Sequence, residues 1–197
     1  MASPPASPFA PSGDAAPGHG SAAPSAWVER FASSVPAGGE VLDLAAGAGR
    51  HARLFLERGH PVVAVDRDVA ALRALAARRA TSAPRLLVVE ADLEQAPGWP
   101  IAPRRFAGVV VTNYLFRPLL PDLVAAVAPG GVLVYETFAT GNERFGRPSN
   151  PDFLLRPGEL LDAVRGELRV IAYEDLVVDF PRPAALQRIA APRPAGS

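Results

Sequence analysis

The stretch VLDLAAGAGRHARLFLERGHPVVAVDRD, residues 41–68, decides the fold. It joins a short apolar segment to a Gly-x-Gly turn, then to a helix-forming segment that Gly59 ends, and then to a second apolar segment that ends at Asp66. A strand, a tight turn, a helix and a second strand form a βαβ unit, whose two strands lie parallel in one sheet. The turn between the first strand and the helix is therefore the first candidate for a ligand-binding site.

The alternation of apolar and helix-forming segments continues along the chain. Further strands are predicted at 85–92, 106–113, 130–138, 167–178 and 184–191, and helices at 25–35, 69–80, 119–128 and 156–166. Most of the strands are almost entirely apolar, which is typical of a sheet buried on both faces by helices. We predict an α/β fold with a Rossmann-like, doubly wound, seven-stranded sheet that is mostly parallel and has an antiparallel last strand.

The two ends of the chain differ in composition from the middle. Residues 1–24 are mainly Pro, Ala, Gly and Ser, which bury too little apolar surface to offset the entropy lost on ordering. Residues 191–197 have the same character. We expect one domain at 25–190 between two disordered tails, since 197 residues are too few for two ordinary domains plus tails.

The composition excludes several classes of function. The formal net charge is zero, so the broad basic surface of a nucleic-acid-binding protein is not expected. The chain has no cysteine and only three histidines, which are far apart in sequence, so neither disulfides nor a metal site is expected. The sequence has no long apolar run and no basic N-terminal signal, and we therefore expect a cytoplasmic protein that does not bind membranes.

Two kinds of ligand suit the glycine-rich turn. Gly47, Gly49 and Ala52 match the pattern G-x-G-x-x-A of dinucleotide-binding folds, which place a pyrophosphate at the helix N-terminus. Asp43, four residues before Gly47, would repel a nearby pyrophosphate by an energy on the order of several kcal/mol. A carboxylate there favours a ligand with a positive centre, such as S-adenosylmethionine, which carries an ammonium and a sulfonium group. The alternative for Asp43 is a structural role in bracing the turn or capping the helix.

Two more carboxylates follow the next two strands. Asp66 ends the second strand, a position from which it can accept both hydroxyls of a ribose in either kind of ligand. Asp92 lies just past the third strand and can accept a hydrogen bond from an adenine amino group, with Ala91 and Leu93 as apolar neighbours. The alternative for Asp92 is the capping of a turn. Carboxylates after three successive strands indicate an adenosine-binding site.

In these features the chain resembles the class I S-adenosylmethionine-dependent methyltransferases. The matching segments are VLDLAAGAGR, VVAVDRD, VVEADLE, VVVTNY and APGGVLVYETF, and the small bacterial TehB-like group looks most similar. The resemblance implies S-adenosylmethionine as the cofactor, with Gly47 and Gly49 lining its methionine moiety, Asp66 on the ribose and Asp92 facing the adenine. Ala45 is a departure at a cofactor-binding position, because the family commonly has glycine there. We expect its methyl group to be tolerated.

Methyl transfer from a sulfonium is an in-line displacement, which needs alignment of the acceptor with the methyl group rather than an obligatory acid or base. Asn113 and Tyr114 follow the fourth strand, where the class I fold presents its acceptor, and they are the candidate catalytic residues. Tyr114 could line the acceptor pocket and Asn113 could orient the acceptor. The alternatives are an aromatic side chain packed at a strand end and an Asx turn.

Three further features have weaker functional interpretations. The segment 139–156 is long and polar, and its Arg144 and Arg147 could form a lid that recognises an anionic substrate. The alternative is a solvated excursion braced by its own contacts. His51 is expected at the surface or as a helix cap, and Glu136 is a further polar candidate at the end of the fifth strand.

Taken together, the residues and the resemblance predict an S-adenosylmethionine-dependent methyltransferase that acts on a small-molecule acceptor, as a monomer or weak homodimer. An NAD(P)-dependent Rossmann oxidoreductase and a non-catalytic S-adenosylmethionine-binding relative are the alternatives. The acceptor atom is left open, because oxygen, nitrogen, sulfur and metalloid nucleophiles can all be methylated on this framework.

Overall fold

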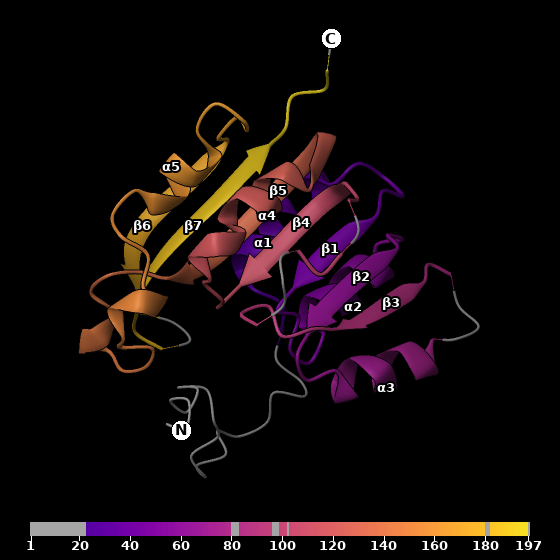
Figure 1. The fold of residues 1–197 in the computed structure, drawn as a ribbon, viewed down its shortest axis with the longest axis horizontal. Helices are drawn as coiled ribbons and strands as arrows, with labels where there is room; N and C mark the ends of the chain where they lie inside the picture. Colours follow the sequence, from indigo (N-terminus) through magenta and orange to yellow (C-terminus); the bar gives the residue numbers. More distant parts are fainter. Residues whose placement is uncertain (1–22, 80–82, 96–98, 102, 180–181, 197) are drawn as a thin grey trace, which may run out of the picture.

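The computed structural model describes residues 23–79, 83–95, 99–101, 103–179 and 182–196. In these residues, seven strands form one sheet in the order β3-β2-β1-β4-β5-β7-β6. All pairs are parallel except those of β7, which runs antiparallel to both β5 and β6 (Figure 1). The predicted fold class is confirmed, including the antiparallel last strand.

The elements follow one another as the sequence predicts. The strands are β1 Val41–Leu44, β2 Val62–Asp66, β3 Leu86–Glu90, β4 Phe106–Thr112, β5 Val127–Phe138, β6 Ala172–Val178 and β7 Ala184–Pro192. The α-helices are α1 Ala26–Phe31, α2 Arg50–Glu57, α3 Ala70–Arg78, α4 Leu120–Ala125 and α5 Glu159–Val164. Four short 3-10 helices are η1 Ala32–Ser34, η2 Arg117–Leu119, η3 Asn142–Arg144 and η4 Pro151–Phe153.

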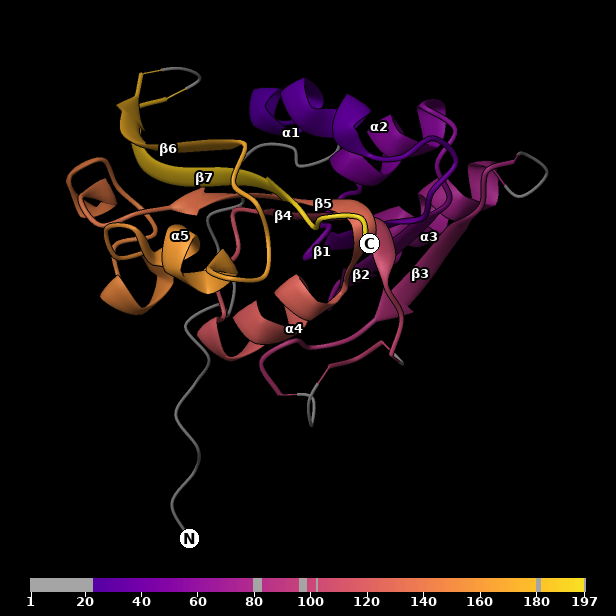
Figure 2. The same cartoon turned by 90° about the horizontal axis from the view of Figure 1, so that it is seen from above.

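Helices cover both faces of the sheet (Figure 2). On one face, α1, α2 and α3 pack around a core that includes Trp27, Phe55 and Leu72. On the other face, α4 and α5 pack around a core that includes Leu123 and Leu160. Strands β1, β2 and β4 are buried almost throughout, which explains why their sequences are continuously apolar instead of alternating.

Several element boundaries differ from the prediction, and two of these differences have an identifiable cause. The predicted helix 119–128 is shorter, because Val127 already pairs with Phe106 of β4 and starts β5. The predicted strand 167–178 begins only at Ala172, and its first two predicted residues, Glu167 and Leu168, still donate to the Val164 carbonyl at the end of α5. Both differences arise from pairing with segments that are distant in sequence or from helix-end geometry, which local apolar patterns do not report.

The ends of the chain are only partly described. β7 runs to Pro192, two residues past the predicted domain end at 190. Residues 1–22, which make up most of the predicted N-terminal tail, and residue 197 lie outside the described residues. Within the described ranges, no helix has the length and hydropathy needed to span a bilayer.

Candidate functional site

The glycine-rich turn joins β1 to α2 at the carboxyl edge of the sheet. Gly47 and Gly49 have φ angles of 54° and 81°, which glycine adopts without strain. A Cβ at Gly49 would lie 2.8 Å from Leu72 Cδ2 of α3, so this position also requires the absence of a side chain. Ala45 has a φ of 53°, a left-handed conformation that favours glycine. The methyl group of Ala45 is therefore accommodated at a cost in backbone strain.

Asp66, at the end of β2, holds the turn in place. The Gly47 N–H donates a hydrogen bond to Asp66 Oδ2, with 2.7 Å between the heavy atoms. The Asp68 N–H donates to Asp66 Oδ1 at 3.0 Å. The carboxylate is thus oriented by the backbone on both sides, and each oxygen keeps a further lone pair for a ligand donor.

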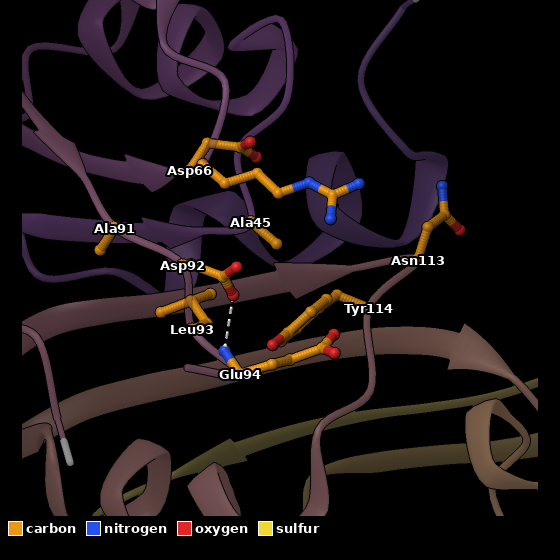
Figure 3. A pocket seen from close by; sticks show the side chains of 9 residues that line it. Ala45, Asp66, Ala91, Asp92, Leu93, Glu94, Asn113 and Tyr114 are labelled. Atoms are coloured by element: carbon orange, nitrogen blue, oxygen red, sulfur yellow. Dashed lines mark hydrogen bonds between the residues drawn. The ribbon is translucent and has the colours of Figure 1, made fainter. Parts of the chain in front are cut away.

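A cavity of about 120 Å³ lies at the carboxyl ends of β1 to β4 (Figure 3). Its walls come from loops that follow all four strands: Ala45, Asp66, Arg67, Ala91, Asp92, Leu93, Glu94, Asn113 and Tyr114. The sequence predicts most of these residues, but not Arg67 and Glu94. Pockets for whole small ligands measure about 300–1,000 Å³, so this cavity has the size for part of a ligand, such as a nucleobase.

One wall of the cavity combines a carboxylate with apolar surface. Asp92 Oδ1 accepts a hydrogen bond from the Glu94 N–H at 3.0 Å, which is the turn geometry that the sequence left open as an alternative (Figure 3). Asp92 is nevertheless part of the cavity wall, and its second oxygen is a further acceptor. Ala91 and Leu93 flank it with apolar surface. Asp92 therefore both closes a turn and faces the cavity.

The two candidate catalytic residues point in different directions. Figure 3 shows the Tyr114 side chain turned into the cavity toward Leu93 and Glu94, whereas the Asn113 side chain turns away from the other side chains. Asn113 has a φ of 55°, a left-handed conformation that asparagine tolerates better than most residues. Its backbone therefore gives one reason for an asparagine at this position. The hydroxyl end of Tyr114 is directed toward the part of the cavity wall that carries Asp92 (Figure 3).

Asp43 lies beneath the turn and not in the cavity wall. Its side chain is 1% exposed, and its Oδ2 accepts a hydrogen bond from the Ala52 N–H at 2.8 Å. Burial raises the pKa of Asp43 to about 7, although the Ala52 N–H and Arg50 oppose the rise. The structure thus gives Asp43 the turn-bracing contact that the sequence left as an alternative. Its contact with a positive centre of the ligand stays a prediction.

The raised pKa of Asp43 predicts a pH-dependent stability. A carboxyl whose pKa is higher in the folded chain than its ordinary value of 3.8 stabilises the fold fully below that value, and this contribution is lost as the pH rises through about 7. In urea unfolding, the wild type should therefore lose free energy of unfolding relative to Asp43→Asn between pH 4 and 7, by an amount on the order of a few kcal/mol. Parallel pH profiles of the two proteins would show that Asp43 does not retain its proton.

A second polar group lies at the ends of β4 and β5, and we call Ser25, His51, Thr112 and Glu136 the Ser25 cluster. The Ser25 N–H donates to His51 Nε2 at 3.1 Å, and Ser25 Oγ donates to Glu136 Oε1 at 2.7 Å. His51 is 2% exposed, so its expected surface position is wrong. Burial and Arg50 lower the pKa of His51 to about 3. A neutral ring whose Nε2 accepts a bond carries its proton on Nδ1, which lies 3.5 Å from Thr112 Oγ1.

The Ser25 cluster continues into a ladder of charges across three strands. Arg188 of β7 lies opposite Glu136 of β5 and opposite Glu174 of β6. Its guanidinium binds Glu136 Oε2 at 3.2 Å and Glu174 Oε2 at 2.7 Å, and it stacks over Trp27 of α1. Glu136 is thus engaged by the start of α1 and by Arg188. This arrangement attaches the first helix to the carboxyl edge of the sheet.

The segment 139–156 folds back on itself. The Asn142 side chain donates to the Pro148 carbonyl at 2.9 Å and accepts from the Ala185 N–H at 3.2 Å. Arg117 of η2 donates to two backbone carbonyls of the segment, at Asp152 and Leu154. These contacts agree with the braced excursion that the sequence left as an alternative. None of the described cavity-lining residues comes from this segment.

Comparison with protein families supplies the remaining observation. Residues 41–131, which contain the turn and all of the residues that line the cavity, match the model of a family described as a methyltransferase domain. This match covers the part of the chain that carries the candidate site. Comparison with curated protein sequences gives no significant match.

Solved structures of very different sequence have the same fold. TehB from Haemophilus influenzae is 16% identical, with a TM-score of 0.66 over 85% of this chain and 61% of TehB. The glycopeptide N-methyltransferase MtfA, solved with S-adenosylmethionine, is 21% identical, with a TM-score of 0.57 over 85% of this chain and 92% of MtfA. The cyclase SpnF is 14% identical, with a TM-score of 0.64 over 86% of this chain and 79% of SpnF. The chain therefore shares their fold, and it spans less than two thirds of TehB.

The cavity lies at the carboxyl ends of the parallel strands, where open α/β sheets bind their ligands. The described residues contain no group of three or more His, Asp or Glu side chains that could hold a metal ion. The side chains that line the cavity supply carboxylates, one arginine, one amide and a phenol.

Proposed function

We propose that this protein is a methyltransferase that transfers the methyl group of S-adenosylmethionine to a small-molecule acceptor. The observation that carries the proposal is the hydrogen bond from the Gly47 N–H to Asp66. A dinucleotide-binding turn offers its N–H groups to a pyrophosphate. Here the Gly47 N–H already has a carboxylate partner and is not free for a pyrophosphate. This argument replaces the charge of Asp43, which burial largely neutralises below about pH 7.

The residues of the site fit the nucleoside half of the cofactor. Asp66 is fixed by two backbone N–H groups and keeps lone pairs for both ribose hydroxyls. Asp92 would accept from the adenine amino group, with Leu93 and Ala45 as apolar walls of the base site. Gly47 would lie along the methionine moiety. The cavity size supports this assignment, because about 120 Å³ suits a base more than a whole cofactor.

The bound cofactor supplies an activated methyl group, so the protein mainly has to hold the acceptor in line with it. Asn113 follows β4 directly and lies at the edge of the cavity, where its amide can orient an acceptor. The Ser25 cluster borders the same end of β4 through Thr112. A formal net charge of zero supports a small acceptor over a nucleic acid. We expect the enzyme to act in the cytoplasm as a monomer or weak homodimer.

A second candidate function is cofactor binding without methyl transfer. The likeness to the cyclase SpnF favours keeping it, because the same fold carries another chemistry there. In addition, every side chain of the cavity wall could serve cofactor binding alone, and none of them is required specifically for methyl transfer. Turnover separates the two candidates.

Turnover is measured as S-adenosylhomocysteine formed from S-adenosylmethionine in the presence of pooled acceptors with amine, hydroxyl, thiol and metalloid oxyanion groups. We expect one class of acceptor to raise the rate above the acceptor-free rate, and Asp66→Ala to remove the increase. Tight cofactor binding without turnover on any pool would favour the second candidate.

A further inference from the structure

The Tyr114 hydroxyl is a buried polar atom without a hydrogen-bond partner among the described residues. Its side chain forms part of the cavity wall and is turned inward (Figure 3). The main chain at this residue is fixed, since the Tyr135 hydroxyl donates to the Tyr114 carbonyl at 2.8 Å. A buried hydroxyl without a partner is costly, so the ring is held in a position that leaves a hydrogen bond to be made by a ligand.

The charges around this hydroxyl determine its role. Burial raises the pKa of Tyr114 well above its ordinary value of 10, and Glu94 and Asp92 raise it further. Arg67 opposes the rise. The phenol therefore keeps its proton at all ordinary pH values. The neighbouring carboxylates can only accept hydrogen bonds when they are ionised. The protonated phenol is therefore the side chain that donates a hydrogen bond on this side of the cavity.

A donor beside an acceptor defines a pattern that a nucleobase can match. Adenine presents an amino group, which donates, next to ring nitrogens, which accept. Hypoxanthine has a carbonyl in place of the amino group and carries a hydrogen on the adjacent ring nitrogen, so its pattern is reversed. Asp92 as acceptor and Tyr114 as donor are complementary to adenine and mismatched with hypoxanthine.

We infer that the Tyr114 hydroxyl donates a hydrogen bond to a ring nitrogen of the adenine, so that Tyr114 and Asp92 together select adenine over hypoxanthine. The inference rests on the proposed function and assigns Tyr114 to the nucleoside and not to the acceptor. It makes Tyr114 a specificity-determining residue of the cofactor site. The chemistry of methyl transfer does not involve it.

The test is calorimetric titration with S-adenosylhomocysteine and with S-inosylhomocysteine, its hypoxanthine counterpart. The wild type should bind the adenine compound at least about 10-fold more tightly, because the hypoxanthine compound leaves buried polar groups mismatched. Tyr114→Phe should weaken binding of the adenine compound by roughly 5- to 20-fold and narrow the preference between the two. Tyr173→Phe, which removes an exposed hydroxyl bonded to Asp175, is the matched control and should bind like the wild type.

Stability of the ligand-free protein provides an independent readout. Because the hydroxyl has no partner, Tyr114→Phe should unfold at the same temperature as the wild type or above it. A lowered unfolding temperature together with unchanged affinities would assign the hydroxyl a structural role and overturn the inference. Unchanged affinity and preference in Tyr114→Phe would overturn it while leaving the proposed function intact, whereas a wild type that binds neither compound would overturn both.

Discussion

Replacing Asp66 with alanine should weaken binding of S-adenosylhomocysteine by at least about 100-fold. The reason is the loss of the two hydrogen bonds that the ribose hydroxyls donate to the carboxylate in the proposed complex. The same carboxylate accepts the Gly47 N–H, so the substitution also releases one side of the glycine-rich turn. Calorimetric titration of wild type and variant gives the two dissociation constants directly. The large effect follows from this double role.

Asp68→Ala is the matched control for this prediction. Asp68 lies two residues further along, carries the same charge and accepts a hydrogen bond from the Ala70 N–H at 3.2 Å, but it does not line the cavity. Its loss should remove the hydrogen bond to the first residue of α3 and leave the affinity within about 3-fold, less than the worth of one ordinary hydrogen bond. Equal losses of affinity in the two variants would show that general charge, and not the position of Asp66, decides binding.

Replacing Gly49 with alanine should lower the free energy of unfolding by about 2–4 kcal/mol, the sum of left-handed backbone strain and overpacking. The φ angle of 81° supplies the strain, and the 2.8 Å approach of a Cβ to Leu72 Cδ2 supplies the overpacking. Urea denaturation measures the change. Cofactor affinity should fall as well, because α2 and α3 must move apart beside the turn.

Gly47→Ala separates the two contributions. Gly47 also has a positive φ angle, but a Cβ there would have no atom within 4 Å. Its substitution should cost only the backbone strain, about 1–2 kcal/mol. If Gly49→Ala lowered the free energy of unfolding no more than Gly47→Ala does, this would contradict the claim that α3 packs closely on the turn at Gly49.

Local sequence signals predict most of the fold and two of the three acidic residues that line the cavity. The glycine-rich turn and the carboxylates Asp66 and Asp92 each follow an apolar strand, and parallel strands bring their carboxyl ends to one edge. The cavity combines them with Ala45 and Leu93. Arg67 and Glu94 lie next to predicted residues, so the loops that carry Asp66 and Asp92 could have indicated them.

The remaining features depend on contacts that no local pattern records. The ladder of Glu136, Arg188 and Glu174 requires the register of two antiparallel pairs. His51 is buried because the chain at Ser25 folds over it, a contact between residues far apart in the sequence. The direction of the Tyr114 side chain depends on the left-handed backbone of the preceding residue and on the packing of four loops. These are tertiary effects, and strand and helix propensities do not predict them.

The identity of the cofactor is tested most directly by calorimetric titration of the purified protein with S-adenosylhomocysteine and, separately, with NADH. The Gly47 to Asp66 hydrogen bond and the three carboxylates of the cavity predict binding of S-adenosylhomocysteine at micromolar concentrations and no detectable binding of NADH. Binding of NADH alone would mean that the turn releases its N–H groups to a pyrophosphate, and it would contradict the assignment of the site.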